Sequence, residues 1–144
     1  MPSYTACQQA NTSFNPSFVP TMVITGSISE IGRSMVEIIA RHLNGRIHIV
    51  LVGRNKSVAE AIIASLPLSN DSTYEFMYCN VMLMKNVHAL AKELSAKLPK
   101  LNYLVHCAGV FGLGGRDETE EGINSRLAAR YYSRFALTND LLRL

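Results

Sequence analysis

The stretch TMVITGSISEIGR, residues 21–33, decides the fold of this chain. Its first five residues form a short β-branched and apolar run, which is typical of a buried strand. Two glycines, Gly26 and Gly32, then precede a segment of helical periodicity. A glycine turn between a strand and a helix favours phosphate binding, because the helix end offers free N–H groups and glycine lets the backbone approach closely. Such loops usually hold three glycines, so the stretch indicates either a working nucleotide site or the remains of one.

Strand and helix patterns alternate along the rest of the chain. The expected strands cover 21–25, 46–52, 74–81 and 101–109, and the expected helices cover 31–43, 57–66, 86–98 and 118–142. This alternation implies right-handed crossovers and a parallel sheet covered on both faces, and the nearly continuous apolar strands agree with it. We therefore predict an α/β fold, a three-layer Rossmann-like parallel sheet with strand order 3-2-1-4.

Turn and charge signals set the limits of these elements. Asn44-Gly45 is expected to end the helix predicted over 31–43. Residues 1–18 are interpreted as a flexible arm before a domain over 19–144, and 110–115 as a flexible loop. Four acidic residues, Asp117, Glu118, Glu120 and Glu121, are expected at the start of the last helix, where the helix dipole favours them.

Three arginines at a spacing of four residues follow on that last helix: Arg126, Arg130 and Arg134. Two interpretations are open. The ladder is a solvated face of the helix, or it is a surface through which the helix docks against a partner.

The composition describes one soluble globular domain. The chain has 144 residues, of which 48% are hydrophobic and 17% charged, with a net charge of +3. That charge is too small to indicate nucleic acid or acidic lipid as a partner. The three cysteines are an odd number without metal-ligand spacing, which favours free thiols in a reducing compartment. With no signal-like segment and no apolar run near the ~20 residues that span a membrane, the expected location is the cytoplasm.

Several motifs, taken in order, resemble the amino-terminal half of the short-chain dehydrogenase/reductase family. Thr25, Gly26 and Gly32 match its T-G-x-x-x-G-x-G loop. The end of its second strand is similar to VGRN (52–55). Its Asp-aliphatic pair is similar to CNV (79–81), and its N-N-A-G motif is similar to LVHCAGV (104–110). TEEGINSRLAARYYSRFALTNDLL (119–142) is similar to the helix with the catalytic Asn. The likeness covers roughly residues 20–144.

The resemblance implies an NAD(P)-binding Rossmann domain, here truncated and incomplete relative to the family. The cofactor-binding residues it implies are Thr25, Gly26, Ser27, Ile31, Gly32, Arg33, Arg54, Asn80, Val81, Ala108 and Gly109. No metal site is expected. Arg54 stands where NAD enzymes carry an acid, and its planar guanidinium can pair with the 2′-phosphate of NADP. NADP is therefore the favoured cofactor, and Arg33 offers a second positive charge beside it.

Four departures from the family pattern predict a weak or vestigial site. Glu30 replaces the middle glycine and brings a carboxylate to the expected phosphate path, although the same carboxylate also favours a helix start. Asn80 replaces an acid but retains an acceptor. His106 and Cys107 replace two Asn residues and are interpreted as a packing pair. Arg130 replaces the catalytic Asn, and a guanidinium cannot accept a hydrogen bond.

No catalytic residue is assigned. The family Ser and Tyr-x-x-x-Lys pair are absent from this chain, and hydride transfer to a carbonyl needs a proton donor within reach. The resemblance implies descent from NADP(H)-dependent oxidoreductases of alcohols or carbonyls, as in secondary-metabolite pathways. Three readings stay open: half of a working enzyme, a non-catalytic nucleotide- or partner-binding protein, and an inert gene product. An open edge on the fourth strand further predicts a homo-oligomer or a protein partner.

Overall fold

One parallel sheet forms the centre of the molecule. The structure, a computed structural model, describes residues 1–110, 115 and 117–144. The sheet has the order β3-β2-β1-β4 and is made of β1 (Thr21–Thr25), β2 (His48–Gly53), β3 (Thr73–Tyr78) and β4 (Tyr103–His106). The predicted class and strand order are confirmed. Thr25 lies opposite both Val52 and His106, so the carboxyl ends of three neighbouring strands meet at one end of the sheet.

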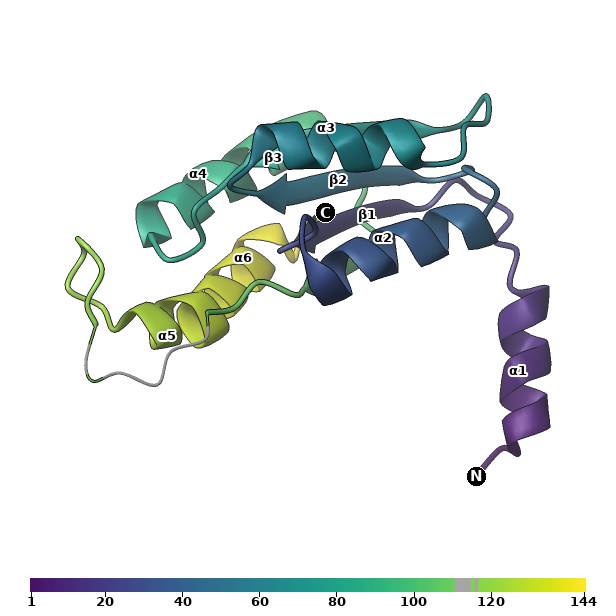
Figure 1. Cartoon of the computed structure of the whole chain (residues 1–144), viewed down its shortest axis with the longest axis horizontal. Helices are drawn as coiled ribbons and strands as arrows, with labels where there is room; N and C mark the ends of the chain where they lie inside the picture. Colours follow the sequence, from purple (N-terminus) through teal and green to yellow (C-terminus); the bar gives the residue numbers. More distant parts are fainter. Residues whose placement is uncertain (111–114, 116) are drawn as a thin grey trace.

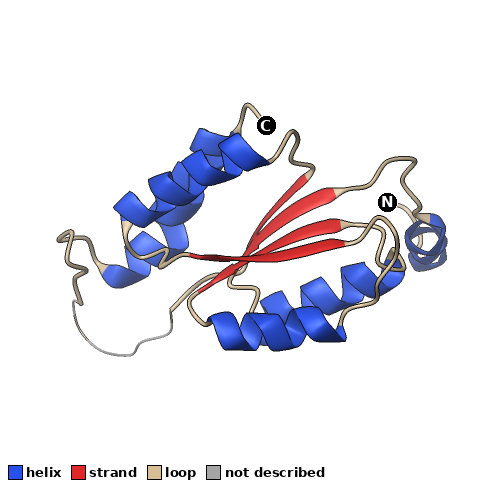
Figure 2. Ribbon diagram, turned by 90° about the horizontal axis from the view of Figure 1, so that it is seen from above, coloured by secondary structure: helices blue, strands red, loops and turns tan. Residues whose placement is uncertain are grey.

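Helices cover both faces of the sheet, which gives the three predicted layers (Figures 1 and 2). One face is covered by α2 (Glu30–His42) and α3 (Lys56–Ser65), and the other by α4 (Met84–Lys97) and α6 (Ser133–Leu141). This arrangement follows from right-handed crossovers on a parallel sheet.

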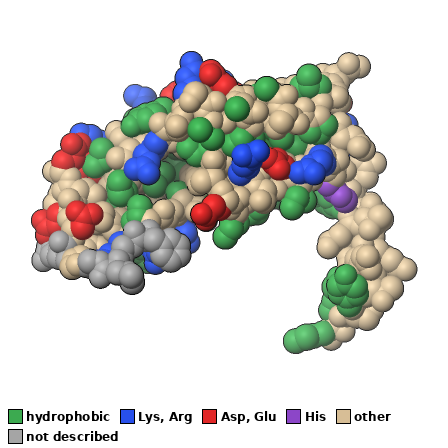
Figure 3. All heavy atoms as spheres, viewed as in Figure 1, with side chains coloured by type: hydrophobic (Ala, Val, Ile, Leu, Met, Phe, Trp, Pro, Cys, Tyr) green, Lys and Arg blue, Asp and Glu red, His purple; other side chains and the backbone are tan. Residues whose placement is uncertain are grey.

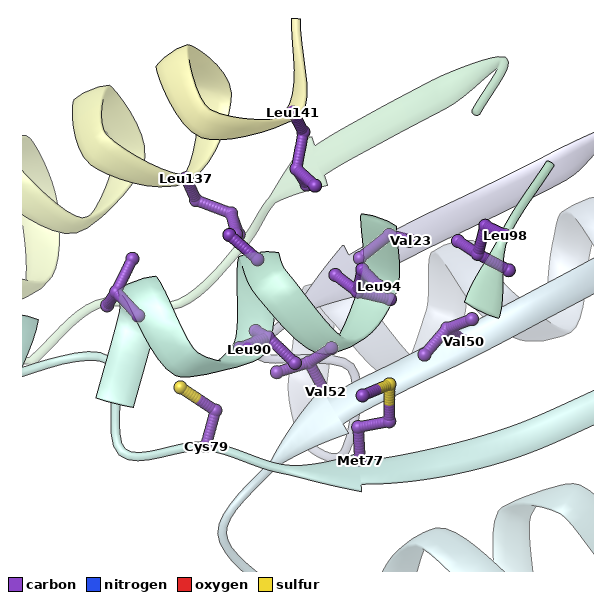
Figure 4. Close-up of a cluster of buried hydrophobic side chains, with 12 residues drawn as sticks. Val23, Val50, Val52, Met77, Cys79, Leu90, Leu94, Leu98, Leu137 and Leu141 are labelled. Atoms are coloured by element: carbon purple, nitrogen blue, oxygen red, sulfur yellow. The ribbon is translucent and has the colours of Figure 1, made fainter. Parts of the chain in front are cut away.

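Alternate strand residues divide the apolar core into two clusters. Val23 and Val50 point towards α4 and α6, where they meet residues such as Leu94 and Leu137 (Figure 4). Ile24 belongs to the cluster on the side of α2 and α3. Because successive strand side chains point to opposite faces, a strand segment buried on both faces must be apolar, as residues 22–24 of β1 and 49–52 of β2 are.

The glycine signal after α2 ends that helix as predicted. The N–H of Gly45 donates to the carbonyl of Ala40 at 2.8 Å. Asn44 and Gly45 have φ values of 49° and 79°, which is the left-handed conformation that closes a helix.

The last helical segment differs from its prediction. It begins at Ser125 rather than 118 and runs through α5 (Ser125–Leu127) and a π-helical turn, η1 (Ala128–Tyr132), into α6. Glu118 and Asn124 form an antiparallel bridge around a turn at Gly122, whose φ is 72°. The expected helix start is wrong because this turn interrupts it, and Asn124 is the cap that accepts from the following N–H groups.

One of the acidic residues before that helix, Glu121, serves a different helix. The carboxylate of Glu121 accepts hydrogen bonds from the backbone N–H groups of Met84 and Lys85, at 2.6 and 3.0 Å. These are the first residues of α4, which has no side-chain cap of its own. The predicted dipole interaction therefore exists, but with α4 rather than with the helix that follows Glu121 in the sequence.

The amino-terminal segment carries a helix that the sequence interpretation missed. Within the expected arm, α1 (Tyr4–Ser13) buries no residue and projects from the body of the molecule (Figure 1). Phe14 stacks on His42 of α2 with ring centroids 6.4 Å apart. The expected loop over 110–115 falls mostly on 111–114, which lie outside the described residues. Across the described part of the chain, no helix combines the length and apolarity that a membrane crossing needs.

Candidate nucleotide site

A cavity of about 280 Å³ lies at the carboxyl end of the sheet. Its wall comes from the β1–α2 loop, the ends of β2, β3 and β4, and the π-helical turn. Eight predicted residues line it: Gly26, Ile31, Gly32, Arg54, Asn80, Val81, Ala108 and Gly109. This position, outside the strand ends where the order of the sheet reverses between β1 and β4, is where open α/β sheets bind ligands.

The two glycines of the loop are required by packing. A Cβ on Gly26 would lie 2.6 Å from the backbone nitrogen of Ala108, and Gly26 has a φ of 72°. A Cβ on Gly32 would lie 2.1 Å from the carbonyl oxygen of Gly26. Both contacts are too short for any side chain. The glycines thus allow the loop to fold onto β4 and onto α2 whether or not a nucleotide is bound.

The amino end of α2 borders the cavity. Ser29 is the cap residue but makes no side-chain hydrogen bond to the helix, and Ser29 and Ile31 both line the cavity. Uncapped N–H groups at a helix start attract anions, because they carry the positive end of the dipole. The geometry therefore fits a phosphate group.

Glu30 occupies that same helix start under strain. It is exposed, lines the cavity and has a φ of 46°, a left-handed conformation that costs an ordinary residue about 1–2 kcal/mol. Its position is the one that the family motif gives to glycine. Glu30 is the first residue of α2, so a carboxylate turned towards the cavity would repel a phosphate held at the helix start.

Arg54 and Asn80, which follow β2 and β3, also line the cavity. Arg54 follows β2, is exposed, and makes no side-chain hydrogen bond or ion pair within the part of the chain that is described. Asn80 uses its Oδ1 to accept from the N–H of Met82 at 3.2 Å. The guanidinium can therefore reach an anion in the cavity, while Asn80 shapes the turn that borders it.

Three predicted site residues are not among those lining the cavity. Thr25 is 2% exposed and belongs to β1. Ser27 is fully buried, and its hydroxyl donates to the carbonyl of Val52 at 3.4 Å. Arg33 donates to Glu37 at 2.7 Å; this hydrogen bond is the main reason that the pKa of Glu37 lies below its ordinary value. Arg33 is thus engaged along α2 rather than at the phosphate path.

The arginine ladder makes contacts within the chain that neither interpretation included. Arg126, Arg130 and Arg134 each donate from Nη2 to a backbone carbonyl of the segment after β4, those of Gly115 at 2.6 Å, Val110 at 2.7 Å and Ala108 at 3.3 Å. The ladder is therefore not merely a solvated face. It fastens the helix to the segment that forms one wall of the cavity.

His106 and Cys107 behave as the predicted packing pair. The Nε2 of His106 lies 3.1 Å from the hydroxyl of Thr138 on α6, and Cys107 lies 3.6 Å from the sulfur of Met35 on α2. Burial, with a smaller effect of Arg134, lowers the pKa of His106. Burial also raises the pKa of the Cys107 thiol, which disfavours the reactive thiolate.

Sequence reasoning did not assign the remaining lining residues to cofactor binding. They are Ile28, Ser29, Glu30, Val52, Gly53, Cys79, Met82, Cys107, Val110, Ala129 and Arg130. Most are neighbours of predicted positions, so extending each motif by one residue would have found them. Ala129 and Arg130 belong to the π-helical turn, and nothing in the sequence pattern signals such a turn. No cluster able to hold a metal ion exists among the described residues.

Comparisons with known proteins agree with this geometry. The model of the KR domain family matches residues 20–137, which is most of the chain. This chain belongs to the short-chain dehydrogenase/reductase family. The family resemblance drawn from the motifs is thereby confirmed, as is the Rossmann-type fold.

Two curated relatives of the chain are fungal oxidoreductases. It is 34% identical to the oxidoreductase AN1596 of Emericella nidulans over 86% of this chain and 37% of the relative. It is 31% identical to the oxidoreductase andH of Emericella variicolor over 100% of this chain and 43% of the relative. The chain therefore spans about two-fifths of the length of these relatives.

Solved structures show the same fold over about half their length. A short-chain dehydrogenase from Sphingobium yanoikuyae in complex with NADPH is 26% identical, with a TM-score of 0.71 over 85% of this chain and 47% of that one. A short-chain dehydrogenase/reductase from Serratia marcescens has a TM-score of 0.72 over 90% of this chain and 52% of that one, at 18% identity.

Proposed function

We propose that this chain is the NADP(H)-binding half of a short-chain dehydrogenase/reductase and that it binds the cofactor weakly. The observation that carries the proposal is a cavity lined both by the uncapped start of α2 and by Arg54. The first suits a pyrophosphate and the second suits the 2′-phosphate of NADP. The NADPH-bound relative from Sphingobium yanoikuyae supports the choice of cofactor.

The residues present fit the cofactor, with one conflict. Gly26 and Gly32 leave room for the phosphates, and Asn80, Val81 and Arg54 would border the adenosine part. Glu30 opposes the pyrophosphate by charge, so the affinity is expected to be below that of a loop with three glycines. When bound, the nicotinamide supplies or accepts a hydride. Bound cofactor would meet no Tyr-x-x-x-Lys pair, because this sequence contains none.

We therefore propose that the chain by itself does not reduce carbonyl compounds, although its descent is from oxidoreductases of alcohols or carbonyls that serve a metabolic pathway. Proton transfer to the carbonyl oxygen needs a positioned donor. Two groups near the cavity, His106 and Cys107, are engaged in packing contacts. A cytoplasmic location is proposed with it, on the ground that Cys7, Cys79 and Cys107 are free thiols.

Titration of the purified chain with NADPH and NADH, followed by cofactor fluorescence, tests the binding proposal. NADPH is expected to bind more tightly, and Arg54→Ala is expected to reduce its affinity about tenfold, as the loss of a charge-assisted hydrogen bond would, while leaving NADH unchanged. Arg143→Ala is the matched control, because Arg143 lies on the last turn of the chain and is absent from the cavity wall. Equal affinity for both cofactors, or an Arg54→Ala chain that binds NADPH normally, would contradict the proposal.

Turnover is tested separately with NADPH and a panel of ketones and aldehydes. The expected result is no substrate-dependent consumption of NADPH. Sustained consumption that disappears in Arg54→Glu would show that the chain carries a catalytic group which these residues do not reveal.

A second candidate function is a non-catalytic partner-binding role. The observation that favours it is the edge of β4, which pairs with β1 alone among the described strands. Unpaired strand edges next to apolar surface favour association with another chain. We propose that a homo-oligomer or a protein partner covers this edge.

A further inference from the structure

The wall of the cavity contains one acidic residue, Glu30, among the residues that the structure describes. The other charged residues in this wall are Arg54 and Arg130. Glu30 is exposed and begins α2. Within the described part of the chain, its carboxylate takes part in no hydrogen bond or ion pair. An unpaired carboxylate in a cavity adds a negative charge to the potential that any ligand meets there.

The basic residues along α2 do not cancel the charge of Glu30. Arg33 pairs with one carboxylate oxygen of Glu37 at 2.7 Å, and Arg41 pairs with the other at 3.2 Å. Figure 3 shows the resulting row of basic and acidic side chains on this helix. Because both guanidinium groups are engaged with Glu37, the charge of Glu30 remains available to interact with whatever occupies the cavity.

Glu30 belongs to the part of the cavity that the proposed function assigns to the middle of the cofactor. That proposal puts the adenosine beside Arg54 and Asn80, after β2 and β3, and the pyrophosphate at the start of α2. The pyrophosphate joins the two nucleosides of NADP(H), so the start of α2 is about one nucleoside away from the nicotinamide. A charge acts over such a separation, because Coulomb energy falls only with the inverse of distance and the walls of a cavity reduce screening.

We propose that Glu30 makes the site discriminate between the two oxidation states of the cofactor by favouring NADP⁺ over NADPH. The two forms differ by one positive charge on the nicotinamide ring, whereas their phosphates are the same. Repulsion between Glu30 and the phosphates is common to both forms and cancels when they are compared. The remaining difference is the attraction of the carboxylate to the ring of NADP⁺, and its sign does not depend on where the side chain points.

The two arginines of the wall do not obscure this effect. Arg54 lies at the adenosine end, where the two oxidation states are identical. The guanidinium of Arg130 donates to the carbonyl of Val110 at 2.7 Å, and its charge opposes that of Glu30. Both arginines stay the same when Glu30 alone is substituted, so their contribution cancels between variants. Across one nucleoside, a unit charge should change the ratio of the two affinities by about threefold to tenfold.

A charge series at position 30 tests the inference. Isothermal titration calorimetry of the full chain with NADP⁺ and with NADPH gives the ratio of the two dissociation constants. We expect Glu30→Gln to strengthen NADPH binding about threefold to tenfold more than NADP⁺ binding, and Glu30→Lys to move the ratio further in the same direction. Glu60→Gln is the matched control, because Glu60 pairs with Lys56 on α3 and is absent from the cavity wall.

The ratio separates an effect of charge from an effect on loop structure. A changed loop conformation alters the affinity for both oxidation states alike and leaves the ratio unchanged. Because Glu30 is exposed, its effect on the ratio should also shrink as the salt concentration rises. A tenfold change in the ratio corresponds to about 30 mV in the midpoint potential of the bound cofactor.

The inference rests on the proposed function, that this chain binds NADP(H), and the titrations distinguish the two. A ratio that is equal in the natural chain, Glu30→Gln and Glu30→Lys overturns the inference and leaves the nucleotide site in place. So does a ratio that moves towards NADP⁺ in Glu30→Gln, or one that moves as far in Glu60→Gln. If no variant binds either form, the nucleotide site is refuted and the inference is refuted with it.

Discussion

The guanidinium of Arg130 donates a hydrogen bond to the carbonyl oxygen of Val110 across 2.7 Å. Arg130 lies in the π-helical turn and Val110 follows β4, so the bond joins two walls of the cavity. A π-helical turn inserts a residue into a helix and changes the direction of its side chains. Arg130, which the family resemblance places at the position of a catalytic Asn, thus supports a backbone segment here.

Removing this bond should loosen the segment after β4. In Arg130→Met, amides of residues 107–110 are expected to exchange about threefold to tenfold faster, which corresponds to a hydrogen bond that contributes ~1 kcal/mol. Hydrogen-exchange mass spectrometry is the measurement. The control variant Arg143→Met should leave the exchange rates of these amides unchanged. If Arg130→Met also leaves them unchanged, the hydrogen bond does not support the segment.

Glu30 combines a charge effect and a backbone effect that two substitutions separate. Glu30→Gln removes the charge but retains a side chain at a φ of 46°, so it should raise NADPH affinity about threefold to tenfold without raising stability. Glu30→Gly removes both, and should additionally raise the free energy of unfolding by about 1 kcal/mol. Denaturant unfolding and NADPH titration of both variants are the measurements. If Glu30→Gln binds NADPH no better than the natural chain, its carboxylate does not face the phosphates.

Gly32 should tolerate no side chain, for a reason unrelated to the cofactor. In Gly32→Ala the new Cβ would lie 2.1 Å from the carbonyl oxygen of Gly26, and such overpacking costs about 1–3 kcal/mol. Thermal or denaturant unfolding should show this loss without any nucleotide present. Gly115→Ala is the control, because nothing lies within 4 Å of a Cβ there. If Gly32→Ala and Gly115→Ala are equally stable, the loop can move away from the new Cβ. A loss of NADPH binding in Gly32→Ala can be assigned to the cofactor site only after this loss of stability has been measured.

The carboxylate of Glu121 should stabilise the fold in a pH-dependent way. Hydrogen bonds from the N–H groups of Lys85 and Met84 lower the pKa of Glu121 from its ordinary 4.5. A carboxyl whose pKa is lower in the folded state stabilises that state above its unfolded pKa, and the effect disappears as the pH falls through the folded pKa. Glu121→Gln should therefore lower the unfolding midpoint at pH 7, and the difference should shrink as the pH falls below 4.5.

Glu93→Gln is the matched control for that measurement, since Glu93 lies in the middle of α4 and caps no helix end. Glu121→Gln and the natural chain are compared by their unfolding midpoints. If these midpoints differ by the same amount at pH 3 and pH 7, the charge of Glu121 is not the cause.

Much of the candidate site could be predicted because it lies at strand ends. Gly26, Arg54, Asn80 and Gly109 come directly after apolar runs, and the carboxyl ends of parallel strands meet at one edge. Arg33 and Ser27 lie in the same motif, yet neither lines the cavity. Their directions depend on partners, namely Glu37 one turn further along α2 and the carbonyl of Val52 on the next strand.

The sequence by itself determined the α/β class, the strand order and the position of the cavity. Apolar periodicity and glycine turns act over a few residues, and the likeness to a Rossmann half supplies the strand order. Only the tertiary structure decided where the last helix begins, that Glu121 caps α4, and that the arginines hold the segment after β4. The last two depend on groups that meet across 11 to 37 residues along the chain, whereas the helix start follows from the turn between Glu118 and Asn124. No local pattern encodes such contacts, since they form only after the sheet has brought its layers together.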